Sequence, residues 1–283
     1  MARDHVLTLS CPDRTGIVHH VSGLLFAHDC NILDAQQFGD PETGRFFLRV
    51  HFDTPAAGRI DTVREAFAPL AEAHAMDWRL HDARRRARLL VLVSRQGHCL
   101  NDLLFRTHSR QLRADIAAVA SNHADYAQLA GSYGVPYHHL PVGSDNREAQ
   151  EQAILELVER EGIDLVVLAR YMQILSPALC DALAGRAINI HHSFLPSFKG
   201  AQPYHQAHAR GVKIIGATAH YVTRELDEGP IIEQDVAHVD HAMTPAALIR
   251  IGSDVESRVL ARAVRLHVEH RILRNGHRTV VFR

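Results

Sequence analysis

The sequence has 283 residues, of which 31 are basic and 32 acidic, so its formal net charge is −1 with neutral histidines. This balance offers no general attraction to nucleic acid, and 46% hydrophobic with 22% charged residues is typical of a globular protein. No run of about 18 uninterrupted apolar residues predicts a membrane span. The length allows one large domain or two domains of unequal size.

The cysteines and the first residues indicate a cellular compartment. The four cysteines are far apart and form no Cys-x-x-Cys pair, which is typical of reduced thiols rather than of disulfides or structural zinc. The opening MARDHVLTLSCPDRTG has charges at Arg3 and Asp4 and no long apolar segment, so it does not resemble a signal peptide. We therefore expect a cytoplasmic protein that contacts neither nucleic acid nor a membrane.

Residues 1–82 alternate short strand patterns with amphipathic helix patterns. Strands are predicted at 5–11, 31–39, 45–53 and 76–81, and helices at 14–29 and 59–75. This βαββαβ order predicts a ferredoxin-like domain. The polar, arginine-rich segment 83–88 follows, and we interpret it as a solvated linker in preference to an anion site.

The remaining residues, 89–283, show a different pattern. The segments 89–94 and 164–169 are continuous apolar runs, as expected for parallel strands buried on both faces. Helical patterns occur at 99–110, 124–134 and 146–162. The alternation predicts a doubly wound, mostly parallel α/β domain, in which ligands bind beyond the carboxyl ends of the strands. The turns at those ends are SRQGH (94–98), SNH (121–123), ARYMQILSP (169–177) and NIHHS (189–193).

The first of these turns argues against a nucleotide cofactor. It contains a single glycine, Gly97, and matches neither the dinucleotide-binding pattern GxGxxG nor a P-loop. The chain also lacks a GxSxG nucleophile elbow. A nucleotide-dependent or serine-nucleophile enzyme is therefore not indicated.

The fourth turn combines an amide and an imidazole. Asn189 and His191 are two residues apart at the end of an apolar strand, so they should share one face, with His192 on the other. Such a pair can polarise a carbonyl oxygen, and a protonated histidine can stabilise the oxyanion formed on attack. The segment 193–200 is rich in helix-breaking residues and predicts an ordered loop. Taken alone, a buried asparagine is more often a structural residue.

A carboxylate could complete this site. Residues 212–236 predict a strand, a turn at LDEG and a second strand, with Asp227 at the tip as a possible base or proton relay. Sequence spacing alone favours an exposed turn for Asp-Glu-Gly-Pro. The histidines do not indicate a metal site, because adjacent histidines on opposite strand faces chelate one ion poorly and no HExxH is present.

Two segments together resemble a known family. INIHHSFLPSFKGAQPYHQA and GATAHYVTRELDEGPIIEQ resemble the motifs of formyltransferase-type enzymes that use 10-formyltetrahydrofolate. The resemblance implies that Asn189, His191 and Asp227 form the catalytic set, and their spacing of 227 − 189 = 38 residues fits the family. It implies 10-formyltetrahydrofolate as the substrate and partner, no separate cofactor, and a supporting or structural role for His192.

The resemblance also implies a folate pocket. The loop 169–177 resembles the segment that holds the pterin ring, with the backbone of 223–226 completing the pocket and His220 matching a further active-site histidine. The implied substrate-binding residues are Tyr171, Met172, Ile174, Leu175, His220, Glu225 and Leu226. For Met172, Ile174 and Leu175, core packing explains the sequence equally well.

Within the family, the chain resembles the deformylase branch. SCPDRTGIVHHVSGLL and CNILDAQQ resemble an ACT domain, HCLNDLLFR and SNHADY resemble deformylases, and QGHCL replaces the GSGTN-like phosphate turn of glycinamide ribonucleotide formyltransferase. The branch implies hydrolysis of the formamide C–N bond of 10-formyltetrahydrofolate, giving formate for one-carbon metabolism and purine biosynthesis.

Two alternatives to hydrolysis are open. The first is transfer of the formyl group to an amine acceptor. The second is an amino-acid-responsive regulator whose catalytic half is vestigial, which the presence of Asn189, His191 and Asp227 disfavours.

The ACT resemblance implies a regulatory site and an assembly. The residues that it implies for binding an effector, with an amino acid as the possible ligand, are Asp13, Gly16, Ile17, Asn31 and Ile32. The same residues could simply build the turn and the start of the helix. ACT units commonly pair edge to edge, so a homo-oligomer, either a dimer or a tetramer, is expected.

Overall fold

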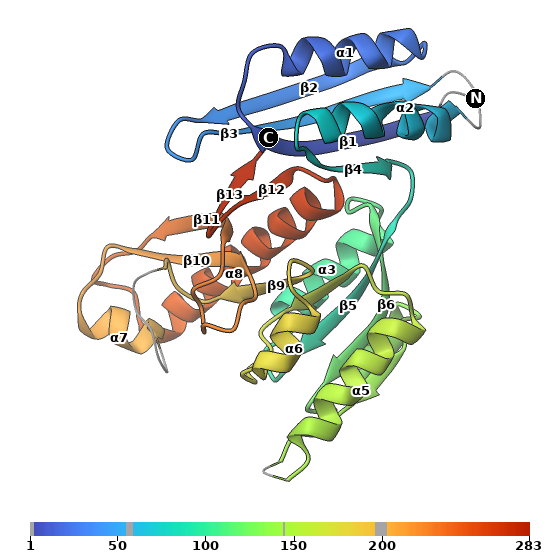
Figure 1. The fold of residues 1–283 in the computed structure, drawn as a ribbon. Helices are drawn as coiled ribbons and strands as arrows, with labels where there is room; N and C mark the ends of the chain where they lie inside the picture. The colour runs from blue at the N-terminus through green and yellow to red at the C-terminus, as the bar shows by residue number, and fades with distance from the viewer. Residues whose placement is uncertain (1–2, 55–58, 144, 196–202) are drawn as a thin grey trace. The chain divides into compact units, whose positions relative to one another are not determined.

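The computed structural model describes residues 3–54, 59–143, 145–195 and 203–283. The chain divides into two compact units, one made of residues 1–86 with 269–283 and the other of residues 87–268 (Figure 1). Both units combine helices and strands, which confirms the predicted α/β fold class.

The first unit has the predicted βαββαβ order. Its elements are β1 (Arg3–Pro12), α1 (Ile17–Ala27), β2 (Asn31–Asp40), β3 (Arg45–Thr54), α2 (Arg59–Ala73) and β4 (Asp77–Asp82). The strands form an antiparallel sheet in the order β2-β3-β1-β4. One face of this sheet and the two helices enclose a single apolar core.

Strand β3 has apolar side chains on both faces. Phe46 and Leu48 point into the core beneath the helices, whereas Phe47 packs on the opposite face against Leu273 and Phe282. Leu273 belongs to the hairpin of β12 (Ile272–Asn275) and β13 (Arg278–Val281). The C-terminal hairpin therefore covers the second face of the sheet (Figure 1).

A buried arginine fixes the start of this C-terminal segment. Arg49, on the same face as Phe47, donates hydrogen bonds to the backbone carbonyls of Glu269 and His270, both at 3.2 Å, and pairs with Asp34 at 3.1 Å. Sequence analysis placed residues 269–283 with the second domain. They pack instead with the first unit, because β3 presents them with an apolar and hydrogen-bonding face.

The second unit contains one mostly parallel sheet. Its elements are β5 (Ala87–Val93), α3 (His98–His108), β6 (Ala114–Ser121), α4 (Ala127–Ser132), β7 (Tyr137–His139), α5 (Arg147–Arg160), β8 (Leu165–Leu168), α6 (Pro177–Ala182), β9 (Ala187–His191), α7 (Pro203–Ala209), β10 (Ile214–Tyr221), β11 (Ile231–His238) and α8 (Pro245–Val268). The strand order is β11-β10-β9-β8-β5-β6-β7. Strands β5 to β9 are parallel, and β10 and β11 form an antiparallel hairpin at one edge.

The strand order creates a crevice where a ligand could bind. The chain proceeds from β5 to β6 and β7 on one side, and later to β8 and β9 on the other side of β5. Ligands of doubly wound sheets bind at such a switch point, beyond the carboxyl ends of the strands. Here Ser94, Arg170 and His191 lie at the ends of β5, β8 and β9, so the fold brings these three segments together.

Helices cover both faces of this sheet. Leu90 and Leu92 of β5 pack on one face with residues of α5 and α6, and α8 packs against β9, β10, β11 and α3. In the described parts of the chain, no helix is long and apolar enough to cross a membrane. None of the four cysteines, all of which the structure describes, forms a disulfide bond. Most of the predicted ordered loop at 193–200 falls outside the described residues.

Candidate active site

Asn189 is fixed by a histidine on the neighbouring strand. Asn189 of β9 lies opposite His220 of β10 in the antiparallel register, and its Nδ2 is 3.3 Å from His220 Nε2. His220 Nδ1 donates to the Tyr221 carbonyl oxygen at 2.9 Å, so Nε2 accepts from the amide. The amide of Asn189 thereby has one orientation, with its second N–H left for another acceptor.

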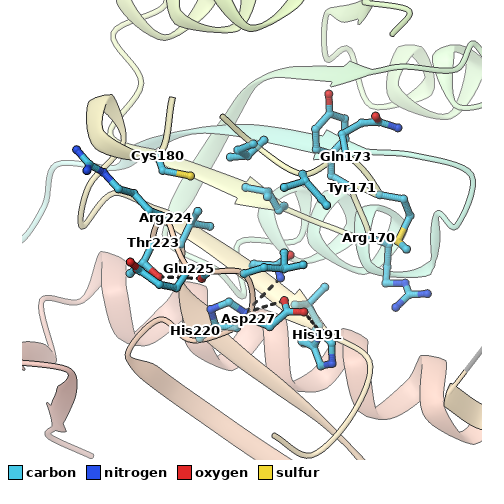
Figure 2. A pocket seen from close by; sticks show the side chains of 18 of the residues that line it. Arg170, Tyr171, Gln173, Cys180, His191, His220, Thr223, Arg224, Glu225 and Asp227 are labelled. Carbon is cyan, nitrogen blue, oxygen red and sulfur yellow. Dashed lines mark hydrogen bonds and ion pairs between the residues drawn. The ribbon is translucent and has the colours of Figure 1, made fainter. Parts of the chain in front are cut away.

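Asp227 joins the two histidines of the site. Its Oδ2 is 3.2 Å from His191 Nδ1 and its Oδ1 is 3.7 Å from His220 Nε2. Figure 2 shows the carboxylate between the two rings. The Asp227 side chain is only 16% exposed, so this carboxylate is turned into the site although its neighbours Leu226 and Glu228 in the LDEG turn are exposed. The structure thus brings together all three predicted catalytic residues.

A glycine holds the Asp227 loop against the end of β10. A Cβ added to Gly229 would lie 1.7 Å from the Tyr221 carbonyl oxygen, so no other residue fits this backbone path. Asp227 itself has a φ of 58°, in the left-handed region, where aspartate is one of the few residue types besides glycine that occur often.

Electrostatics keep this carboxylate ionised. Burial would raise the pKa of Asp227, but its polar contacts with His191 and His220 hold that pKa well below its usual range. The other nitrogen of the first ring, His191 Nε2, is buried and has no hydrogen-bond partner among the described residues. The ring therefore has one nitrogen fixed by Asp227 and the other available to a ligand oxygen.

These residues line a cavity of about 350 Å³ (Figure 2). The seven predicted substrate-binding residues all line it, namely Tyr171, Met172, Ile174, Leu175, His220, Glu225 and Leu226. Its walls are the loop after β8, the end of β9 and the segment 222–227 after β10. The cavity is thus mostly apolar, with the Asn-His-Asp set at one place on its wall.

The structure separates pocket lining from core packing in the loop after β8. Met172 and Ile174 are 57% and 62% exposed, so they belong to the pocket wall and not to the core. Leu175 and Tyr171 also pack in the core between the sheet, α5 and α6. Burial raises the pKa of Tyr171 to about 12, and its hydroxyl accepts a hydrogen bond from Gln150 at 2.7 Å.

His192 lies beside His191. The two rings stack with their centroids 5.0 Å apart, and both line the cavity. The predicted opposite orientation of His192 is wrong, because β9 ends at His191 and strand alternation does not extend beyond it. Burial and the positive charges of Arg170 and His191 lower the pKa of His192 to about 4. His192 is therefore neutral near pH 7.

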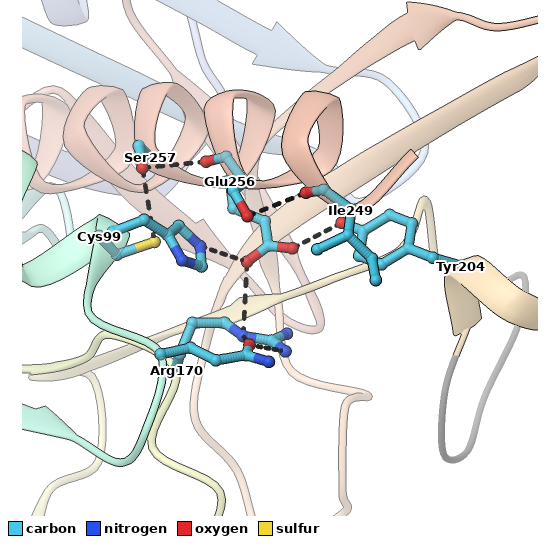
Figure 3. A network of polar contacts seen from close by, with 9 residues as sticks. Cys99, Arg170, Tyr204, Ile249, Glu256 and Ser257 are labelled. Atoms are coloured by element: carbon cyan, nitrogen blue, oxygen red, sulfur yellow. Dashed lines mark hydrogen bonds and ion pairs between the residues drawn. The ribbon is translucent and has the colours of Figure 1, made fainter. Parts of the chain in front are cut away.

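Sequence analysis missed a buried polar network beside the pocket (Figure 3). Arg170 has a φ of 63° and is 7% exposed, and its Nε donates to Gln96 Oε1 at 2.7 Å. Its Nε is also 3.4 Å from Glu256 Oε2. Arg170 Nη1 is buried without a hydrogen-bond partner among the described residues.

Glu256 is the centre of this network. It is 1% exposed and accepts hydrogen bonds from His98 at 2.7 Å and from the Tyr204 hydroxyl at 2.5 Å. Burial would raise the pKa of Glu256, but the His98 hydrogen bond and the Arg170 charge lower it. The sequence feature that could have revealed this network is Glu256 itself, a charged residue on the buried face of the long amphipathic helix α8.

One group in the described parts of the chain has metal-ligand chemistry. Ligand atoms of His98, Cys99 and Glu256 lie within 4.8 Å of one another. Burial strongly raises the pKa of Cys99, which keeps the thiol protonated, and Arg170 already supplies a cation to Glu256. This donor set therefore suits a metal ion poorly.

The five predicted effector residues lie in the first unit. Gly16 has a φ of 93° at the start of α1, and Ile17 is buried in the core, so both are accounted for by the helix start. Asn31 and Ile32 begin the edge strand β2, where Ile32 is 39% exposed. Asp13 donates its backbone N–H to the Gly44 carbonyl at 2.9 Å. An effector role for these residues stays a prediction.

Comparison with known proteins gives the family. Residues 87–264 match the formyl transferase family and residues 5–72 match the ACT domain. A formyltetrahydrofolate deformylase from Corynebacterium sp. (strain P-1) is 51% identical over 280 residues, covering 99% of this chain and 98% of that protein. The chain belongs to the formyltetrahydrofolate deformylase family.

Solved structures agree with this membership. The crystal structure of a formyltetrahydrofolate deformylase from Burkholderia mallei is 52% identical and has a TM-score of 0.95, covering 99% of this chain and all (100%) of that one. A glycinamide ribonucleotide transformylase from Symbiobacterium toebii is 34% identical with a TM-score of 0.67, covering 70% of this chain and 95% of its own. The deformylase family thus shares both units, whereas that transformylase matches only part of the chain.

Proposed function

We propose that this protein hydrolyses 10-formyltetrahydrofolate to formate and tetrahydrofolate. The observation that supports this proposal most strongly is the arrangement of Asn189, His191 and Asp227 on the wall of one apolar cavity. Full-length similarity to formyltetrahydrofolate deformylases supports the same reaction.

The apolar part of the cavity would hold the pterin ring. Met172, Ile174 and Leu226 are each more than half exposed in the chain, at 57%, 62% and 59%, and all line the cavity. Exposed apolar side chains around a concavity favour a flat, largely apolar ligand. Residues 223–226 line the same cavity, so their backbone groups would bond to polar edges of the ring.

Asn189 and His191 would bind the formyl oxygen. His220 fixes the Asn189 amide, which has a second N–H to donate, and His191 Nε2 has no hydrogen-bond partner among the described residues. A protonated His191 would stabilise negative charge on this oxygen, and Asp227, 3.2 Å from His191 Nδ1, fixes the orientation of the ring. Two fixed donors on one oxygen stabilise the tetrahedral intermediate more than the neutral substrate.

Asp227 would orient the attacking water and take part in the proton transfers. A water oxygen bonds to the formyl carbon and loses a proton, the C–N10 bond breaks, and N10 gains a proton as tetrahydrofolate leaves. Because the pKa of Asp227 is held low, its first task is to orient the water and to pair with His191. It accepts a proton only as charge develops in the transition state. The products are tetrahydrofolate, formate and one released proton.

The test is formate release from 10-formyltetrahydrofolate by the purified full-length protein. We expect stoichiometric formate and tetrahydrofolate in buffer that contains no amine. Added amine acceptors should not be formylated. Formation of a formylated amine with no free formate would overturn the proposal in favour of a transferase.

Regulation and assembly are further parts of this proposal. An ACT domain suggests effector binding, and we propose an amino acid as effector and a homo-oligomer as the working form. Adding free amino acids to the formate assay tests the effector, and light scattering at micromolar concentration tests the assembly. A monomer, or rates unaffected by every amino acid, would contradict the respective part. Formate supply for purine biosynthesis in the cytoplasm is the physiological role that we propose.

A further inference from the structure

The Arg170 side chain carries a buried positive charge that its neighbours neutralise only in part. Two of its N–H groups donate to Gln96 Oε1, which is a neutral amide oxygen. The nearest carboxylate, Glu256, is 3.4 Å from Nε and already accepts hydrogen bonds from His98 and Tyr204. The guanidinium therefore retains the capacity to bind a further anion.

One atom of this group has no partner in the part of the chain that the structure describes. Arg170 Nη1 is buried and makes no hydrogen bond there, although the residue is only 7% exposed. A buried donor without an acceptor costs free energy, and it costs more when the group is charged. A ligand oxygen that reaches Nη1 would recover this free energy.

Arg170 also keeps a backbone conformation that is unfavourable for its residue type. Its φ of 63° lies in the left-handed region, where glycine would be free of strain. The Ser94 N–H bonds to the Arg170 carbonyl at 3.2 Å, and the Met172 N–H bonds to Ser94 Oγ at 2.9 Å, so the turn is fixed on both sides. The turn holds the arginine beside the cavity, which Arg170, His191 and His192 all line.

The proposed hydrolysis creates one new anion. The formyl group of the substrate is neutral, whereas its product, formate, carries a full negative charge once the acid has lost its proton. Arg170 and His191 both line the cavity where this product forms, and each has a buried nitrogen, Nη1 and Nε2 respectively, without a hydrogen-bond partner among the described residues. Charged donors bind a small carboxylate far more strongly than a neutral formamide.

We propose that Arg170 forms, with His191, a product subsite that binds the carboxylate of formate. This inference rests on the proposed function. It assigns Arg170 to product binding, where sequence analysis assigned it no role. The subsite favours a small anion with a single charge, because the Glu256 carboxylate lies 3.4 Å from Arg170 Nε and would repel a more highly charged anion.

The test measures formate binding directly and through inhibition. Sodium formate labelled with ¹³C is titrated onto the folate-free, full-length protein by NMR, with sodium chloride at equal ionic strength as the reference. The formate inhibition constant is measured in the deformylation assay. We expect Arg170→Gln to weaken both by at least about tenfold, the loss of a charge-assisted hydrogen bond.

Matched variants separate this role from folding. Arg170→Gln leaves the buried Glu256 less compensated, so the double variant Arg170→Gln/Glu256→Gln removes both charges and should show the same loss of formate affinity. Arg170→Lys retains the positive charge and should lose less formate affinity than Arg170→Gln. Arg262→Gln changes an arginine whose partner Asp235 keeps a second arginine, Arg258, and it should bind formate as the unaltered protein does.

Each outcome decides one proposal. Unchanged formate affinity in both Gln variants overturns the subsite, and so does equal competition by chloride, which would mean an ionic-strength effect only. If the unaltered protein releases no formate from 10-formyltetrahydrofolate, the proposed function fails, whatever the NMR titration gives. Arg170-dependent formate binding together with formate release supports both.

Discussion

Asn189 and His220 occupy opposed positions on two antiparallel strands, and the side-chain amide of Asn189 lies 3.3 Å from His220 Nε2. His220 donates its Nδ1–H to the backbone carbonyl of Tyr221. Its Nε2 is therefore an acceptor, and it sets the orientation of the Asn189 amide. The same ring lies 3.7 Å from Asp227. One histidine therefore sets the orientation of an oxyanion donor and lies beside the acidic group of the proposed mechanism.

Replacing Asp227 with asparagine tests the acidic group. The substitution keeps the size of the side chain but removes the charge that pairs with His191, and it cannot accept a proton. We expect turnover to fall roughly 10²–10⁴-fold, the range for loss of a general acid–base group. Folate binding, measured by equilibrium dialysis, should change little. Near-normal turnover would remove Asp227 from the catalytic set.

Alanine substitutions at the two stacked histidines separate their roles. His191 contacts Asp227 and has the unpartnered nitrogen, so His191→Ala should lower turnover by about 10²–10³-fold, as expected for an oxyanion donor. His192→Ala removes a neutral neighbour of His191 and should lower turnover less than His191→Ala does. The single-turnover rate of formate release measures both. The reverse order would assign the oxyanion to His192.

Gly229 should be intolerant of any side chain. In Gly229→Ala the new Cβ would lie 1.7 Å from the Tyr221 carbonyl oxygen, so the loop that carries Asp227 must move. We expect a loss of about 2 kcal/mol or more in the free energy of unfolding, together with a large loss of turnover.

A second glycine provides the control for this experiment. Gly131 lies within α4, and a Cβ added there meets nothing within 4 Å. Gly131→Ala should leave stability unchanged or slightly raised, because alanine is the better helix former. Urea denaturation gives the free energies. Equal effects at both glycines would show that the Gly229 contact does not hold the loop.

His192 should make the folded protein sensitive to acid. Burial and the charges of Arg170 and His191 lower its pKa to about 4 in the folded state, whereas an unfolded chain has a histidine pKa near 6.5. As the pH falls below about 6.5 the unfolded state binds a proton that the folded state does not, so stability decreases until about pH 4. The slope is at most about 1.4 kcal/mol per pH unit for one such group.

His192→Gln should reduce this dependence without abolishing it. His81 in the first unit also has its pKa lowered to about 4, by burial and by the charge of Arg79, and it would contribute independently. Urea unfolding at pH 7, 6 and 5 measures the slopes for both proteins. The same slope in the variant and in the unaltered protein would mean that His192 is protonated in the folded state as readily as in the unfolded state.

The amino-acid sequence by itself determined the order of the elements and the chemical groups of the site. Alternating patterns predicted the βαββαβ unit, and continuous apolar runs predicted the buried parallel strands β5 and β8. Both predictions were possible because the spacing of apolar residues along a strand depends on whether one or both of its faces are buried. The resemblance of two motifs selected Asn189, His191 and Asp227, and these three residues lie together in the structure.

Only the tertiary structure decided what lies beside these residues. Periodicity cannot show that His192 stacks on His191, since the strand ends between them, nor that Arg170 meets Glu256 from a distant helix. It also cannot show that Phe47 covers the C-terminal hairpin. A local pattern reports whether a side chain is buried. Which partner buries it depends on strand order and helix packing, which join residues far apart in the chain.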